Sequence, residues 1–142
     1  MAFNVLIVDD SSSMRAVIKR TIKVSGFNVG EYFEAGDGRE ALKILSSNWV
    51  DLILSDINMP NMNGLELMAE IKKNELLSSI PVVMVTTEGS EKIVEESIRL
   101  GASKYIKKPF FPEDIKNMLR SLVGEEVGDV GGNDGSDASG DF

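Results

Sequence analysis

Residues 5 to 12 of the chain read Val-Leu-Ile-Val-Asp-Asp-Ser-Ser (VLIVDDSS). Four consecutive apolar residues are typical of a buried strand, yet this run ends in two adjacent carboxylates, Asp9 and Asp10. Two like charges at the edge of a core repel each other and lose hydration, so a chain that keeps them there usually supplies a counter-ion. The stretch therefore predicts a central strand with a charged site at its end.

The composition limits the chemistry that this site can use. A chain of 142 residues with 42% hydrophobic content can bury one sizeable core, which predicts one domain. The chain contains no cysteine and no histidine, which excludes disulfides, Ser-His-Asp or Cys-His triads and the usual zinc ligands. Any metal must therefore be a hard ion bound by oxygen.

The sequence carries no sign of membrane insertion or nucleic-acid binding. No apolar run approaches the ~18 residues of a membrane span, and no signal peptide is recognisable. Residues 124–142 hold six acids and no base, so they account for most of the net charge of −8 and leave −2 for residues 1–123. Neither part has the basic excess that binds nucleic acid or an anionic membrane. We expect a soluble, cytoplasmic protein.

Apolar runs alternate with helix-period segments five times along the chain. Ser11 or Ser12 is the candidate N-cap of the first helix, Gly26 its C-terminal stop and Asp37 the candidate N-cap of the second. The alternation predicts an α/β fold with a parallel sheet, helices on both faces and the charged second strand at an edge. The expected strands span 4–8, 29–35, 50–55, 80–86 and 103–107, and the expected helices span 13–26, 37–47, 65–73, 90–100 and 112–123.

Polar residues follow four of the five expected strands. In open parallel sheets, ligands bind at the carboxyl ends of the strands, so these residues should meet at one rim. They are Asp9 and Asp10 after the first strand, Asp56 after the third, Thr86 and Thr87 after the fourth and Lys108 after the fifth.

The predicted rim suits a phosphoryl group bound with a metal ion. At an effective dielectric near 20, two carboxylates ~4 Å apart repel by roughly 4 kcal/mol, so three of them require a cation, and Mg²⁺ fits an all-oxygen site. A divalent cation, a hydroxyl and a lysine together can hold the oxygens of a phosphoryl group while another oxygen attacks it. Asp56 could supply that attacking oxygen and form an acyl phosphate.

Four stretches in this order resemble the receiver domain of two-component response regulators: VLIVDDSSSMR, DLILSDINMPNMNGLELM, IPVVMVTTEGS and GASKYIKKPF. The resemblance covers roughly residues 3–123, and within the family it is to the stand-alone chemotaxis regulators of the CheY type, because no output domain follows. It implies a doubly wound, flavodoxin-like sheet of five parallel strands in the order 2-1-3-4-5. It also divides the chain into a receiver domain, 1–123, and an acidic, Gly-rich tail, 124–142.

The resemblance implies a role for each rim residue. Asp56 would be the phosphorylated nucleophile, and Lys108 would pair with its carboxylate or its phosphoryl oxygen. Mg²⁺, or Mn²⁺ in its place, would be bound directly by Asp10 and Asp56, through water by Asp9, and by the backbone carbonyl of Asn58.

Further residues are implied in switching and in the lifetime of the acyl phosphate. Thr86 would hydrogen-bond the phosphoryl group and move toward it, and Tyr105 would turn inward as Thr86 moves. Asn58 and Glu88 would tune the lifetime, and Lys108-Pro109 would be a cis peptide.

The implied partners are other proteins. Because this chain has no histidine, the phosphoryl donor would be the phosphohistidine of a separate histidine kinase. The target would be a protein such as the flagellar motor switch, with a phosphatase as a further partner and the chain itself as a monomer. Enzymatic activity would be limited to self-phosphorylation and autodephosphorylation. The alternative function is a phosphorelay intermediate or a regulator of another two-component pathway.

Other interpretations stay open at this point. The fold could serve as a binding module that needs no phosphorylation, or belong to a flavodoxin-like or haloacid-dehalogenase-type enzyme, although the latter would place Asp-x-Asp after the first strand. Gly36 to Ala41 fits a dinucleotide-binding pattern, but it follows the charged strand rather than a buried central one. The tail is expected to be disordered, with the alternative that Phe142 folds back near Lys92, Lys104 and Tyr105.

Overall fold

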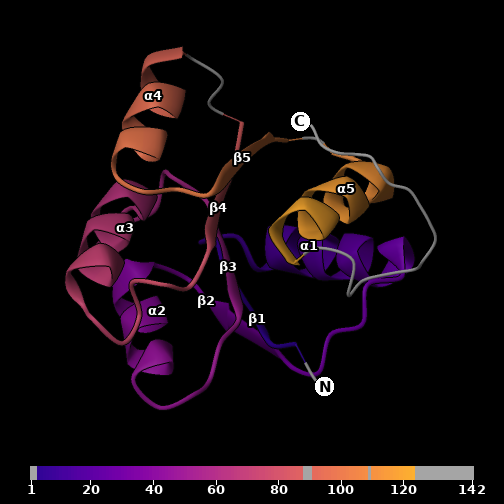
Figure 1. Cartoon of the computed structure of the whole chain (residues 1–142), viewed down its shortest axis with the longest axis horizontal. Helices are drawn as coiled ribbons and strands as arrows, with labels where there is room; N and C mark the ends of the chain where they lie inside the picture. Colours follow the sequence, from indigo (N-terminus) through magenta and orange to yellow (C-terminus); the bar gives the residue numbers. More distant parts are fainter. Residues whose placement is uncertain (1–2, 88–90, 109, 124–142) are drawn as a thin grey trace.

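The computed structural model describes residues 3–87, 91–108 and 110–123. Within these residues, five strands alternate with five helices, as expected (Figure 1). The strands are β1 (Val5–Val8), β2 (Tyr32–Ala35), β3 (Leu52–Ser55), β4 (Val82–Thr86) and β5 (Lys104–Lys107). The helices are α1 (Ser12–Ser25), α2 (Gly38–Leu45), α3 (Gly64–Lys73), α4 (Glu91–Arg99) and α5 (Pro112–Val123).

The strands form one parallel sheet in the order β2-β1-β3-β4-β5, which confirms the predicted flavodoxin-like topology. The charged strand β2 lies at an edge, as predicted. Its ladder begins at Tyr32, later than the predicted residue 29, because the preceding residues meet β1 through isolated bonds: the Gly30 amide donates to the Phe3 carbonyl at 2.8 Å. Strand β2 lies on one side of β1, and β3, β4 and β5 lie on the other. The strand order therefore reverses at the β1–β3 pair, and the two strands that precede Asp9 and Asp56 are neighbours.

The sheet is covered on both faces, with α1 and α5 on one side and α2, α3 and α4 on the other (Figure 1). Leu6 and Val8 face the cluster under α2 to α4, whereas Val5 and Ile7 face the cluster under α1 and α5. All four side chains are fully buried. Burial on both faces explains why this strand reads as a continuous apolar run rather than an alternating one. No helix among the described residues is long and apolar enough to cross a bilayer.

Side-chain caps fix where the helices near the rim begin. The Ser11 hydroxyl accepts a hydrogen bond from the Met14 amide at 3.1 Å, so Ser11 is the N-cap of α1. Asp37 caps α2, and Asn63 forms a capping box with Glu66 at the start of α3. Gly26 ends α1 with φ of 87°, a left-handed conformation that favours glycine. The three N-caps hold the strand-to-helix loops at the carboxyl edge of the sheet, whereas Gly26 ends α1 at the opposite edge.

Candidate functional site

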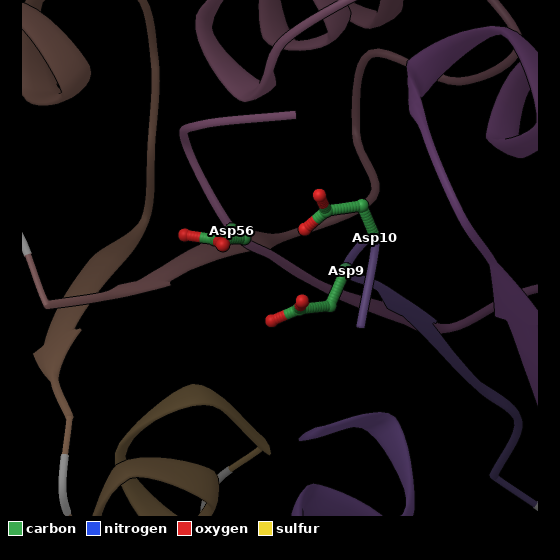
Figure 2. A group of neighbouring side chains, drawn as sticks. All are labelled: Asp9, Asp10 and Asp56. Carbon is green, nitrogen blue, oxygen red and sulfur yellow. The ribbon is translucent and has the colours of Figure 1, made fainter. Parts of the chain in front are cut away.

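Three carboxylates meet at the carboxyl edge of the two central strands (Figure 2). Asp9, Asp10 and Asp56 each offer one oxygen, and these oxygens all lie within 4.8 Å of one another. The pairing of β1 with β3 explains the cluster, because the Asp56 amide donates to the Val8 carbonyl at 2.9 Å and so lies beside the end of β1. The rim predicted from strand ends is therefore confirmed for these three residues.

Asp9 is the buried member of the cluster, with 2% of its surface exposed. One carboxylate oxygen accepts the Ser11 amide at 2.9 Å, and the other accepts the Lys108 ammonium at 2.8 Å. Its backbone carbonyl accepts a guanidinium N–H of Arg15 at 2.6 Å. Both oxygens of Asp9 thus have protein partners, whereas Asp10 is exposed to solvent. This difference is consistent with the expected division in which Asp10 meets a metal directly and Asp9 acts through water.

Lys108 reaches the acidic cluster from the end of the edge strand β5. Its backbone amide donates to the Thr86 carbonyl at 2.9 Å, which places it at the end of β5 beside β4. The ammonium lies 2.8 Å from the nearer Asp9 oxygen and 3.7 Å from Asp56 Oδ2, and only 10% of the side chain is exposed. The expected pairing of Lys108 with Asp56 is therefore the longer of two ion pairs, and the closer partner is Asp9.

Two opposing effects act on the pKa of the Asp56 carboxyl, namely burial and the nearby charge of Lys108. Burial raises the pKa of its carboxyl above the ordinary value of 3.8, and the positive charge of Lys108 opposes this rise. The Ile57 amide, which donates to Oδ1 at 2.7 Å, and the Thr86 side chain also lower this pKa, whereas the charge of Asp9 raises it. A cation at the cluster would favour the carboxylate form that a nucleophile needs.

Gly64 holds the loop after β3 close to Asp56. Its amide donates to the Ile57 carbonyl at 2.8 Å. A Cβ at this position would overlap the carbonyl oxygen of Asp56 and would lie 2.9 Å from Ile57 Cα. Only glycine allows the start of α3 to approach the Asp56 backbone so closely. This role of Gly64 was not predicted from the sequence, although a glycine directly after the Asn63 N-cap was a usable signal.

Arg15 is a second contributor that the sequence analysis missed. Its Nε donates to the Glu34 carboxylate at 2.9 Å while its terminal nitrogen holds the Asp9 carbonyl. The edge strand β2 is thereby connected to the backbone of the acidic cluster. Arg15 lies one turn into α1. Its partner Glu34 could not be chosen from the sequence, because Lys19 and Lys23 of α1 also lie near β2.

Thr86 and Tyr105 lie on the same face of the sheet. Thr86 ends β4 and is 1% exposed. Tyr105 pairs with Met84 in the β4–β5 register, and both residues belong to the apolar cluster under α2 to α4. Since Thr86 lies two residues after Met84, its side chain points to this face too. The hydroxyl oxygen of Tyr105 is buried, and the predicted switch roles of both residues stay predictions.

Three other predictions concern loops. Asn58 is exposed in the loop after β3, two residues beyond Asp56, and its roles in metal binding and lifetime stay predictions. Glu88 and Pro109 lie outside the described residues, as do residues 124–142.

The donor set fits Mg²⁺. The three clustered residues offer only carboxylate oxygens, the ligand type that this ion prefers, and one member is exposed enough to leave room for water and a phosphoryl oxygen. Within the described ranges, this is the one group of at least three acidic residues close enough to bind a metal ion. The finer division of the expected ligands, in which Asp10, Asp56 and the Asn58 carbonyl bind the ion directly and Asp9 acts through water, stays a prediction.

Together, the sheet order and the acidic cluster at its switch point define a flavodoxin-like α/β protein with a candidate metal site at the carboxyl edge. The model of the response regulator receiver domain matches residues 5–120, and the chain belongs to this family.

Two of the curated relatives are chemotaxis proteins. The chain is 39% identical over 125 residues to a chemotaxis protein CheY homolog of Campylobacter jejuni, covering 87% of this chain and 95% of the relative. It is 38% identical over 120 residues to chemotaxis protein CheY1 of Helicobacter pylori, covering 84% and 95%. Among solved structures, chemotaxis protein CheY4 of Vibrio cholerae has a TM-score of 0.76 at 35% identity, covering 87% of this chain and all of that one. A CheY-like receiver domain protein from Methanospirillum hungatei has a TM-score of 0.75 at 28% identity, covering 89% and 97%.

Proposed function

We propose that the protein is a single-domain response regulator that accepts a phosphoryl group from a histidine kinase onto Asp56 and changes its affinity for a target. The observation that carries the proposal is the arrangement around Asp56: two further carboxylates within 4.8 Å and the Lys108 ammonium 3.7 Å away. Membership of the receiver family and the chemotaxis names of the relatives support the assignment to chemotaxis.

The reaction begins with Asp56 as a carboxylate. One of its oxygens attacks phosphorus while the N–P bond of a phosphohistidine breaks, and the freed imidazole takes a proton from solvent. Lys108 supplies a positive charge beside the attacking group, and the Thr86 side chain is close enough to hydrogen-bond the Asp56 carboxyl. Mg²⁺, when bound, supplies charge that neutralises the carboxylates and the phosphoryl oxygens. Water later attacks phosphorus, which releases inorganic phosphate and restores the carboxylate.

The output is a shift between two conformations. The phosphoryl group would attract the Thr86 hydroxyl, and Tyr105, whose hydroxyl is already buried on the same face of the sheet, would be held inward. Asn58 and Glu88 would set how easily water reaches the acyl phosphate. Partners of the proposed switch are a histidine kinase, a flagellar switch target and a phosphatase, which a monomeric protein would meet in the cytoplasm.

The experiment is phosphorylation with a small donor. The purified protein is incubated with acetyl phosphate and Mg²⁺, and intact mass is measured, with EDTA and Asp56→Asn as controls. We expect one added phosphoryl group that is lost in both controls. No added mass in Mg²⁺, or an equal gain in Asp56→Asn, would contradict the proposal.

A further inference from the structure

The helix α1 carries an unbalanced positive charge. Its 14 residues include four bases and no acid, whereas each of the other four helices includes at least one acid. This is unusual in a chain whose net charge is −8. A basic helix on an acidic protein points to an acidic partner.

Glu34 neutralises only part of this charge. Its carboxylate accepts Arg15 Nε at 2.9 Å and Lys19 Nζ at 2.8 Å. Lys23 lies nearby, with its ammonium 5.7 Å from the centre of the Tyr32 ring. Arg20 and Lys23 are both exposed, and neither makes an ion pair within the part of the chain that the structure describes. Two cations on this helix are therefore available to a carboxylate from elsewhere.

Apolar side chains lie beside these cations. Val17 is 52% exposed and Val24 is 66% exposed, although valine is usually buried. Val17, Arg20 and Val24 follow one another at i, i+3 and i+7, which places them on one stripe of the helix. The stripe would suit a segment that combines carboxylates with small apolar side chains.

The chain contains such a segment directly after α5. Residues 125–130 read Glu-Glu-Val-Gly-Asp-Val, and residues 124–142 as a whole contain six acids and no base. The segment directly follows α5 in the chain, and α5 packs against α1, the helix that the segment would bind (Figure 1). At about 3.3 Å per residue, residues 124–142 could extend roughly 60 Å, and α1 at 1.5 Å per residue is only about 21 Å long. Tethering gives such a segment a local concentration on the order of millimolar.

We propose that the acidic segment 124–142 docks on the outer face of α1, around Val17, Arg20, Lys23 and Val24. Acidic side chains of the segment bind Arg20 and Lys23, and its valines cover Val17 and Val24. Any protein that approaches this face of α1 must then displace the segment, so the contact regulates access to the helix. The docking needs neither phosphorylation nor metal, and it stands or falls separately from the proposed function.

The test uses a spin label on the segment and amide NMR signals of the folded domain. Since the chain has no cysteine, Asn133→Cys provides a single labelling site in the full-length protein. At an ionic strength of about 0.02 M, we expect loss of amide signal intensity from Val17 to Val24, and recovery of that intensity at about 0.5 M, where charges are screened within a few ångströms. The salt comparison is needed because a tethered segment that does not dock also passes near α1.

Two matched double variants distinguish docking on α1 from docking on the basic residues of β5. Arg20→Gln combined with Lys23→Gln should restore the α1 signals at low salt, and Lys104→Gln combined with Lys107→Gln, which removes the same charge from β5, should leave them broadened. Signal loss that is insensitive to salt and to the α1 variant would overturn the proposal. So would loss centred on β5, or on the groove beside Trp49 and Leu76 between the ends of α2 and α3.

Discussion

The ammonium of Lys108 lies 2.8 Å from a carboxylate oxygen of Asp9 and 3.7 Å from Asp56. Both Lys108 and Asp9 are almost completely buried, so each is the main counter-ion of the other in the metal-free protein. A buried charge that loses its partner is far more costly than a pair removed together. The pair therefore keeps Lys108 at the site and offsets part of the repulsion among the three carboxylates.

We expect Lys108→Met to destabilise the metal-free protein by about 3 kcal/mol at neutral pH, because it leaves the buried Asp9 carboxylate unpaired. Adding Asp9→Asn to this variant should recover most of the loss. Urea unfolding followed by circular dichroism in EDTA measures both. A loss below about 0.5 kcal/mol for Lys108→Met, the size of an exposed pair, would show that the two residues do not depend on each other.

Asp56→Asn should make the metal-free protein more stable at neutral pH, by the order of 1 kcal/mol that is typical of a single substitution. The pKa of Asp56 is raised in the folded state by burial, so the folded protein binds a proton more tightly than the unfolded chain. Stability then falls as pH rises from the ordinary value of 3.8 through the folded pKa, and this fall is absent in the variant. Unfolding across this pH range should show a difference that is small in acid and largest at neutral pH. An unchanged difference across the range would contradict this explanation, and Mg²⁺ should reduce the difference because it stabilises the wild type more.

Gly64→Ala should disturb the site through the backbone. The added methyl group would overlap the Asp56 carbonyl oxygen, and we expect a cost of about 2–3 kcal/mol together with slower phosphorylation. Gly26→Ala is the matched control, because its φ is 87° but nothing lies within 4 Å of the new Cβ. It should cost about 1–2 kcal/mol and leave phosphorylation unchanged. Equal phosphorylation rates for the two variants would show that the approach of Gly64 to Asp56 is unimportant.

Glu34→Gln tests the connection between β2 and the acidic cluster. Hydrogen bonds from Lys19 and Arg15 lower the pKa of Glu34 below its ordinary value of 4.5. The stabilisation is therefore complete above the ordinary value and is lost as pH falls through the folded pKa. Because the pair is partly exposed, we expect a loss of about 0.5–1 kcal/mol at neutral pH that disappears in acid.

The control for Glu34 is Glu70→Gln, which removes a more exposed pair with Lys73 on α3. Its effect should be close to zero. If both variants lose the same stability, the bridge from Glu34 to Arg15 adds no more to the fold than an exposed ion pair.

Much of the site could be predicted from sequence because it depends on topology. Parallel strands bring their carboxyl ends to one edge, so apolar runs followed by Asp9, Asp56 or Lys108 were enough to place these residues together. The helix starts at Ser11 and Asp37 followed from side chains that satisfy free amides.

What could not be predicted depends on side-chain geometry across several elements. Lys108 follows the edge strand β5, and its shorter distance to Asp9 than to Asp56 depends on how the packed structure places the two carboxylates. The contact of Gly64 with the Asp56 backbone and the bridge from Glu34 through Arg15 likewise require the packed structure. Periodicity gives no information on either.

In the proposed reaction Asp56, rather than Asp9 or Asp10, carries the phosphoryl group. The direct measurement is reduction of the phosphorylated protein with borohydride, which converts an aspartyl phosphate to homoserine, followed by peptide sequencing by mass spectrometry. We predict homoserine at position 56 and unmodified aspartate at positions 9 and 10. Homoserine at position 9 or 10, or at no aspartate of the cluster in protein that has gained a phosphoryl group, would contradict the account.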